Sequence, residues 1–68
     1  MRKNLQQARS KSGMTQQELA DALGINVRTY QYIEAGIREG SVELWLKLEK
    51  LFGESIEYLL QKDAHMNI

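Results

Sequence analysis

The chain has no cysteine and no proline among its 68 residues, and it has no long apolar run. Without cysteine it can form neither a disulfide framework nor a thiolate metal site, which makes a reducing compartment the simplest setting. The charged start, Met1 to Lys3, resembles that of a signal peptide, but polar residues follow where an apolar segment is required. Because no run approaches membrane-spanning length, we expect a cytoplasmic protein.

Residue types that carry catalysis are also scarce. His65 is the only histidine, and it lies in residues 63–68, which we expect to be a flexible tail beyond a domain of residues 1–62. The sequence contains no Ser, His and Asp arrangement, no paired carboxylates and no phosphate-binding glycine loop. We therefore predict no enzyme activity, no cofactor and no metal site.

The charge of the chain is balanced overall but not along its length. Nine basic and nine acidic side chains give a net charge of zero, whereas a DNA-binding domain is expected to be basic. Residues 1–32 carry five basic and two acidic side chains, a balance of +3, and residues 33–68 have a balance of −3. A chain this short forms one small domain, which needs well-packed helices or a second copy for stability.

The segment from residue 15 to residue 36 has the pattern of two short helices joined by a tight turn. Thr15 and Glu18 have the spacing of a capping box, which begins the first helix. Apolar side chains then share one face of it: Leu19, Ala20 and Leu23. Gly24 ends this helix, and Asn26 is a good N-cap for the next. Because the turn is too short for antiparallel helices, the pattern predicts a helix-turn-helix.

The second helix of the motif, expected over residues 26–35, has one side for packing and one for contact. Tyr30 and Ile33 point back toward the first helix. The opposite side carries Val27, Arg28, Gln31, Tyr32 and Ala35. Arginine can pair with guanine, glutamine with adenine and valine with a thymine methyl group, so we predict that this side enters a major groove. The alternatives are a solvated surface charge for Arg28 and a packing role for Tyr32.

Three further helices complete the predicted fold. The first covers residues 2–12, with Leu5 and Ala8 facing inward and Arg2 facing solvent. Arg9 lies beside the inward face, where we expect it to pair with Glu34, the alternative being that both are solvated. The polar loop 37–40 can follow a phosphate backbone.

Residues 42–52 form a helix that is apolar on more than one face, and a last short helix begins after Ser55. A helix that is apolar nearly all round should be buried nearly all round, so we expect one face to meet another chain. The residues predicted at this dimer interface are Leu44, Leu48, Leu51 and Tyr58. The alternative is that the leucines belong to the core.

These residues together resemble the phage repressor and Cro-like (Xre-like) helix-turn-helix family. The resemblance covers roughly residues 5–60 and rests on the segment 13–20, the corner 23–25, the Ile33-Glu34 pair before Gly36, and the pattern from Ser41 to Leu60. It implies an all-α, compact, five-helix lambda-repressor-like DNA-binding domain with the helix-turn-helix at helices 2 and 3. It also implies a transcriptional repressor that binds a palindromic operator as a homodimer.

The resemblance also implies roles for individual residues. Gln16 corresponds to a phosphate-contacting position, Thr29 to a backbone contact, and the Arg9 and Glu34 pair to a structural ion pair. The complete set of expected DNA contacts is Gln16, Gln17, Val27, Arg28, Thr29, Gln31, Tyr32 and Arg38. Three departures from the family pattern matter. The hydroxyl of Tyr30 needs a partner, and Gly40, where proline is frequent, is expected to loosen its loop. Glu49 stands where a small apolar residue is common, so we expect its stripe to be partly open or Glu49 to be paired.

A second function stays open at this point. The neutral net charge also suits a protein-interaction module, of the antitoxin or anti-regulator type, that keeps the fold but acts mainly through its fourth and fifth helices on a protein partner.

Overall fold

The computed structural model describes residues 1–62, which form five helices and no strand. The helices are α1 (Lys3–Lys11), α2 (Gln16–Leu23), α3 (Val27–Ala35), α4 (Val42–Phe52) and α5 (Ile56–Leu60). The all-α prediction is therefore confirmed, and the predicted helix boundaries hold to within one or two residues. The expected tail, with His65, lies outside the described residues. None of the described helices is long and apolar enough to cross a bilayer.

Short polar side chains begin four of the five helices, as their sequence positions predicted. The capping box of α2 is complete, since Thr15 Oγ1 accepts from the Glu18 amide and the Glu18 carboxylate accepts from the Thr15 amide. Asn26, Ser41 and Ser55 each accept a backbone N–H of the helix that follows them. Only α1 begins without a side-chain cap, because Arg2 in that position bonds elsewhere.

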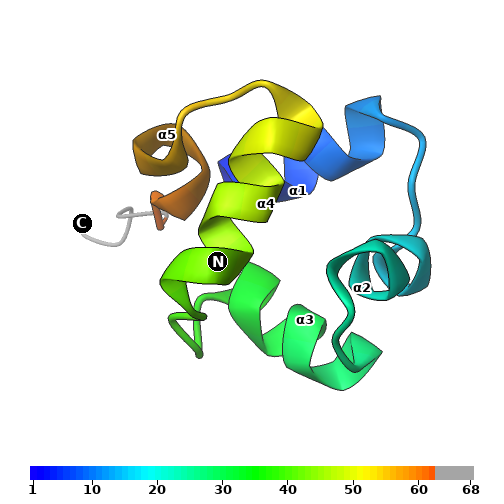
Figure 1. The fold of residues 1–68 in the computed structure, drawn as a ribbon. Helices are drawn as coiled ribbons and strands as arrows, with labels where there is room; N and C mark the ends of the chain where they lie inside the picture. The colour runs from blue at the N-terminus through cyan, green and yellow to red at the C-terminus, as the bar shows by residue number, and fades with distance from the viewer. Residues whose placement is uncertain (63–68) are drawn as a thin grey trace.

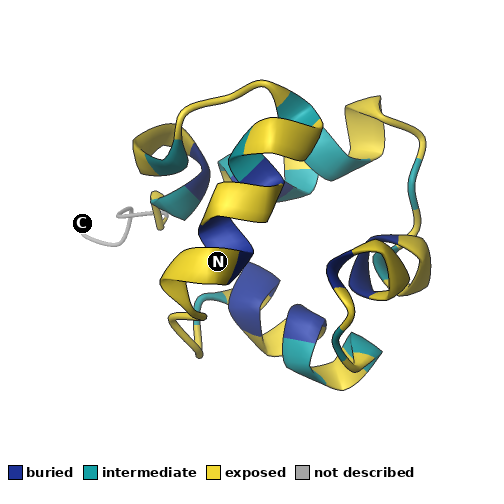
Figure 2. Ribbon diagram, in the orientation of Figure 1, coloured by how far each residue is buried: buried dark blue, intermediate teal, exposed yellow. Residues whose placement is uncertain are grey.

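The helices enclose one core (Figure 1). α2 and α3 cross steeply and form the lower right of the view, while α4 packs on α2 and α5, and α1 packs on α3 and α5. Buried residues line the inner side of these helices, and exposed ones cover the outer side (Figure 2). The buried apolar residues are Leu5, Leu19, Ala20, Leu23, Tyr30, Ile33, Leu44, Trp45, Leu48 and Leu59.

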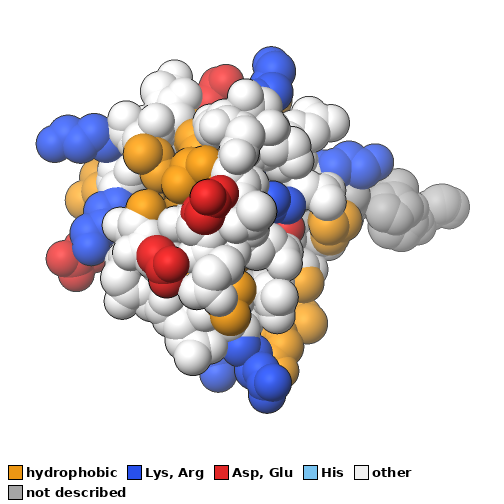
Figure 3. Space-filling model, turned by 90° about the vertical axis from the view of Figure 1, so that its right-hand side faces the viewer, with side chains coloured by type: hydrophobic (Ala, Val, Ile, Leu, Met, Phe, Trp, Pro, Cys, Tyr) orange, Lys and Arg blue, Asp and Glu red, His pale blue; other side chains and the backbone are white. Residues whose placement is uncertain are grey.

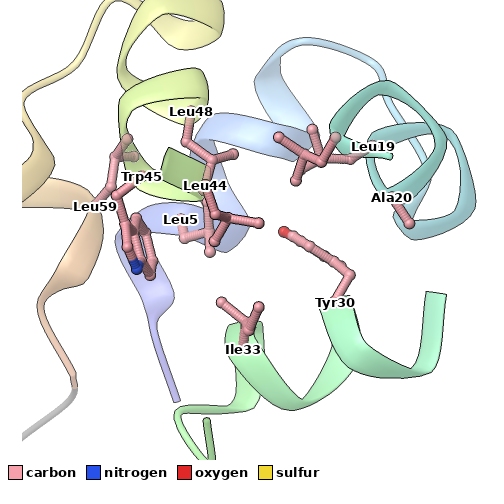
Figure 4. Packing of buried hydrophobic residues seen from close by; sticks show 10 residues of the cluster. Leu5, Leu19, Ala20, Tyr30, Ile33, Leu44, Trp45, Leu48 and Leu59 are labelled. Carbon is pink, nitrogen blue, oxygen red and sulfur yellow. The ribbon is translucent and has the colours of Figure 1, made fainter. Parts of the chain in front are cut away.

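Tyr30 is an aromatic residue at the centre of this core. Its side chain reaches from α3 toward Leu44 and Leu19 (Figure 4), and it is completely buried. A buried hydroxyl without a partner would be costly, but this one donates to Glu34 Oε2 at 2.5 Å. The tyrosine is therefore accommodated by the carboxylate one helical turn further along α3.

Arg2 does not face solvent, and that prediction was wrong. The residue is 0 % exposed. Its position three residues before Leu5 places it on the buried stripe of α1. The helical spacing of residue 2 thus predicts a buried side chain. The expectation of exposure rested only on the general preference of charged side chains for water.

Two of the four residues predicted at a dimer interface belong to the core of the protein's own chain. Leu44 is buried and Leu48 is 0 % exposed, because both lie in the apolar core on the side of α4 that packs on α2 and α5. They therefore offer no surface to a second copy. Leu51 and Tyr58 remain exposed, at 47 % and 39 %.

Gly40 holds its loop tightly rather than loosening it. Its φ is +79°, and a Cβ there would lie 2.9 Å from Leu44 Cδ2 and 3.0 Å from Trp45 Nε1. Proline is excluded, since its ring requires φ near −65°. The glycine lets the backbone before α4 pass directly against the core.

Gly40→Ala is expected to destabilise the fold by about 2–4 kcal/mol, because it adds overpacking to the cost of a left-handed backbone. Gly13→Ala is the matched control, since Gly13 has φ +73° but open space around its Cβ position. Gly13→Ala should lose only the free energy that a left-handed backbone costs a residue with a Cβ, about 1–2 kcal/mol. Urea unfolding followed by circular dichroism measures both, and equal losses would show that the contacts with Leu44 and Trp45 cost nothing.

Candidate nucleic-acid interface

One side of α3 is buried and the other is open. Tyr30, Ile33 and Glu34 lie inside, whereas Arg28 and Gln31 are exposed on the outer side. Asn26 Oδ1 accepts from the Arg28 amide at 2.7 Å, which orders the first turn of the helix where Arg28 stands. The inner contacts thus hold the helix while its outer side chains stay accessible.

The eight residues predicted to contact DNA differ in how far they reach the surface. Those exposed are Gln17, Arg28, Gln31, Tyr32 and Arg38, and those of intermediate exposure are Gln16, Val27 and Thr29. Val27 packs partly against the core, so it offers less surface to a base than the sequence suggested.

Arg38 lies beside the exposed end of α3. Its guanidinium stands over the ring of Tyr32, with the carbon centre 5.7 Å from the ring centroid, a cation–π distance. Its backbone amide donates to the carbonyl of Tyr32 at 3.2 Å. Tyr32 and Arg38 thus form one unit that joins α3 to the loop after it.

A chain of hydrogen bonds links the exposed side of α3 to its buried side. Gln31 Nε2 donates to Gln16 Oε1 at 3.1 Å, and Gln16 Nε2 donates to Glu34 Oε1 at 2.9 Å. The side chain of Gln16 therefore faces the protein and supports Gln31. The amides of Gln16 and Gln17 belong to the first turn of α2, whose N–H groups have no partner within the helix.

Glu34 is the buried end of that chain and accepts from three helices. Besides Gln16, Arg9 Nε donates to Oε2 at 2.9 Å and Tyr30 donates its hydroxyl. Arg9 also donates to the Met14 carbonyl at 2.8 Å, which fixes the connection between α1 and α2. The carboxylate thereby ties α1, α2 and α3 together.

The hydrogen bonds decide the ionisation of this network. Burial by itself would raise the pKa of Glu34, but the bonds from Arg9, Tyr30 and Gln16, with the charge of Arg9, bring the pKa below its usual value. Burial and the bond to the carboxylate raise the pKa of Tyr30, so the hydroxyl keeps its proton. The bond to Glu34 raises the pKa of Arg9 despite burial. The pair is therefore charged at neutral pH.

The basic residues of the chain are divided between the surface and internal pairs. Of the five basic residues in the positive half, Arg2 is buried and Arg9 is paired, whereas Lys3, Lys11 and Arg28 are exposed. Figure 3 shows Lys and Arg side chains at the lower edge of the molecule, at the height of α3 and the loop after it in Figure 1. The positive field at α3 is thus local and comes from few charges.

Sequence reasoning missed the role of Arg2 and the link between Gln16 and Gln31. The periodicity of α1 signalled the first, since residues 2, 5 and 9 share one face. No local signal existed for the second, because the two glutamines lie on different helices. Within residues 1–62, no three His, Cys, Asp or Glu side chains stand close enough together to hold a metal ion.

The five-helix fold with two steeply crossing helices, α2 and α3, defines a class of helix-turn-helix domains. The helix-turn-helix family model matches residues 5–59, from near the start of α1 to near the end of α5. The chain is a member of this helix-turn-helix family, in its Cro/C1 or Xre-like form.

Several HTH-type transcriptional regulators are similar to the chain. The HTH-type transcriptional regulator ImmR of Bacillus subtilis (strain 168) is 39 % identical over 61 residues, which are 90 % of this chain and 48 % of ImmR. The HTH-type regulator YqaE of the same strain is 31 % identical over 65 residues, or 96 % of this chain and 56 % of YqaE. An HTH-type regulator of Archaeoglobus fulgidus is 37 % identical over 59 residues, covering 87 % of this chain and 84 % of that protein.

The chain spans about half the length of the two Bacillus relatives. No solved structure matches it significantly.

Proposed function

We propose that this chain is the sequence-specific DNA-binding domain of a transcriptional regulator, a cytoplasmic repressor without enzyme activity. The observation that carries the proposal is the two-sided α3, whose inner residues are locked in the core while Arg28 and Gln31 stand exposed. A helix held in this way can be inserted into a major groove without losing its support. The similarity to HTH-type transcriptional regulators agrees with this function.

In this proposal the residues around α3 divide into two kinds of contact. Arg28 and Gln31 contact base edges, for which arginine and glutamine have matching donor and acceptor patterns. Arg38 contacts the phosphate backbone from the loop, and the free amides of Gln16 and Gln17 do so from the start of α2. Tyr32, Thr29 and Val27 border these contacts.

The regulator is proposed to act as a homodimer on a palindromic operator. Two α3 helices then enter successive major grooves about 34 Å apart. The surface available for pairing includes Leu51, which lines a shallow groove together with Ala22, Leu23, Lys47 and Lys50. Exposed apolar side chains on a domain this small favour such a partner.

Arg28→Ala is expected to weaken binding to the preferred operator by about 1–3 kcal/mol and to relax its sequence preference, because a base contact is lost. The operator is first obtained by selecting bound duplexes from random DNA, and affinity is measured by fluorescence anisotropy. Lys3→Ala is the matched control, since it removes one exposed positive charge from the start of α1, which the proposal assigns neither to DNA contact nor to pairing. It should leave the preference unchanged.

Two results would contradict the assignment. One is an Arg28→Ala variant that binds selected and random duplexes as the parent does, which would place the contact surface elsewhere. The other is a selection that recovers no preferred sequence.

A protein-interaction module is the second candidate function. It is favoured by the exposure of Val42 and Leu46, at 76 % and 52 %, on the outer side of α4, together with the zero net charge. This function predicts that the chain binds a different protein through α4 and α5, and that it binds that protein equally well after Arg28→Ala. Sedimentation of the parent and of Arg28→Ala, each with and without operator DNA, separates the two functions. A regulator loses operator binding with this substitution, whereas an interaction module keeps its protein partner.

A further inference from the structure

Arg2 is a buried cation that contacts three separate parts of the chain. Its Nη1 donates to the carbonyls of Ile33 at 2.8 Å and Arg38 at 3.1 Å. Its Nε donates to the carbonyl of Leu60 at 3.1 Å, and its Nη2 to Glu39 Oε1 at 3.1 Å. The ends of α3 and α5 and the loop between α3 and α4 therefore meet at one guanidinium.

This number of contacts explains how a charge is tolerated at 0 % exposure. A buried cation is costly unless it is paired and hydrogen-bonded, and the flat guanidinium of Arg2 offers five donors in a fixed arrangement. The guanidinium also lies 5.1 Å from the ring centroid of Trp45. Ile33 and Leu60 stand in last helical turns, where the helix dipole is negative. The Ile33 carbonyl accepts from the Gly36 amide at 3.1 Å as well as from Arg2.

The loop that Arg2 holds is the one that carries Arg38. The carbonyl of Arg38 accepts from Arg2, and the amide of Arg38 donates to the carbonyl of Tyr32. The backbone of Arg38 is thus fixed on both sides. The direction in which its side chain leaves the loop follows from these two bonds.

Arg2 also acts on the acid next to Arg38. Glu39 is 72 % exposed, and a free carboxylate there would repel a phosphate. Its Oε2 accepts from Lys62 Nζ at 2.7 Å and its Oε1 from Arg2. The two cations bind both oxygens of the carboxylate and balance its negative charge.

We infer that Arg2 is a positioning residue for DNA binding: it holds the α3–α4 loop so that Arg38 faces the phosphate backbone, and with Lys62 it neutralises Glu39. This inference rests on the proposed phosphate contact of Arg38. Arg2 itself is buried and touches no DNA. Its effect on affinity is transmitted entirely through the loop.

The test is a double-mutant cycle between Arg2 and Arg38. The probe is a random-sequence duplex of about 30 base pairs, whose affinity is measured by anisotropy at several salt concentrations. Arg38→Ala should weaken binding severalfold and reduce the slope of log K against log salt by about 1. Arg2→Lys keeps the charge but lacks the guanidinium fork, so it should cause a similar change in affinity and slope. The double variant should bind no more weakly than Arg38→Ala.

Asn4→Ala is the control for a purely structural effect. Asn4 Nδ2 donates to the Tyr58 carbonyl at 2.9 Å and so ties α1 to α5 without touching the loop. This variant should lose stability and keep the parent's affinity and salt slope. All measurements are made at a temperature where circular dichroism shows each variant folded. If Arg2→Lys does not fold at any such temperature, Arg2→Gln, which retains two amide donors, replaces it in the cycle.

Two outcomes overturn the inference. If the losses from Arg2→Lys and Arg38→Ala add in full, or if Arg2→Lys binds with the parent's affinity and slope, Arg2 supports the fold alone. If Arg38→Ala itself binds as the parent does, both the phosphate contact and the role of Arg2 are wrong. The recognition by α3 is judged separately, by Arg28→Ala on the selected operator.

Discussion

Glu34→Leu is expected to lose about 3–5 kcal/mol of folding free energy, which is the cost of removing one partner from a buried ion pair. The variant leaves Arg9 Nε and the hydroxyl of Tyr30 without their acceptor, and the charge of Arg9 without its counter-ion, inside the protein. A domain of this length has a total stability of about 3–10 kcal/mol. The variant should therefore lose about a third or more of the stability of the domain. Urea denaturation followed by circular dichroism at pH 7 measures this loss.

Two companion variants show whether the loss comes from unpaired groups rather than from the altered shape. Glu34→Gln keeps an acceptor oxygen and should lose less, about 1–3 kcal/mol. Arg9→Met combined with Glu34→Leu removes both charges and should recover part of the loss. A double variant that is as unstable as the sum of its parts would show that the ion pair is not the cause.

The same carboxylate makes the fold sensitive to acid. Since the pKa of Glu34 is lower in the folded state than in the unfolded chain, the unfolded chain binds more protons as the pH falls. The stabilisation is complete above the unfolded pKa, near 4.3, and is lost as the pH falls through the folded value. Glu34→Gln should therefore lose less stability than the parent between neutral pH and about pH 3. Equal losses would mean that other carboxylates dominate acid unfolding.

Leu48→Glu is expected to unfold the protein outright. Leu48 is 0 % exposed among the apolar residues of α4, so the substitution removes a core side chain, which alone costs about 2–5 kcal/mol, and buries an unpaired carboxylate as well. Together these terms reach the whole stability expected for the domain. A thermal scan by circular dichroism should show no cooperative transition for this variant at neutral pH.

Leu51→Glu is the matched variant one turn further along the same helix. Leu51 is 47 % exposed, so this substitution should leave the fold intact and change stability by about 0.5 kcal/mol or less. If Leu51 belongs to the proposed dimer interface, sedimentation should show loss of self-association and operator binding should weaken with it. A dimer that survives Leu51→Glu but dissociates with Leu46→Glu would place the interface on the other edge of α4.

These two leucines also show where the sequence stops being sufficient. The pattern of α4 is apolar on more than one side, and it does not say which side meets the core and which meets solvent. Leu48 and Leu51 look equivalent in the sequence. The directions from which α2 and α5 approach the helix decide that one is enclosed and the other is open.

The distribution of charged residues also shows what the sequence alone does not determine. The interpretation of a positive first half counted Arg2 and Arg9 as part of the field available to DNA. In the folded chain both are engaged with Glu39 and Glu34, which belong to the negative half. Folding thus brings the two halves together and cancels part of the asymmetry that the linear sequence displays.

The sequence by itself determined the five helices and the helix-turn-helix, because their signals act over four residues or fewer: Thr15 with Glu18, Asn26 with Arg28, and the 3.6-residue spacing of apolar side chains. Only the tertiary structure decided the role of Arg2, whose hydrogen-bond partners lie between 31 and 58 residues away along the chain. The physical reason is that a cap or a helical stripe is satisfied within its own segment, whereas a buried charge is satisfied only by groups that folding brings to it from elsewhere.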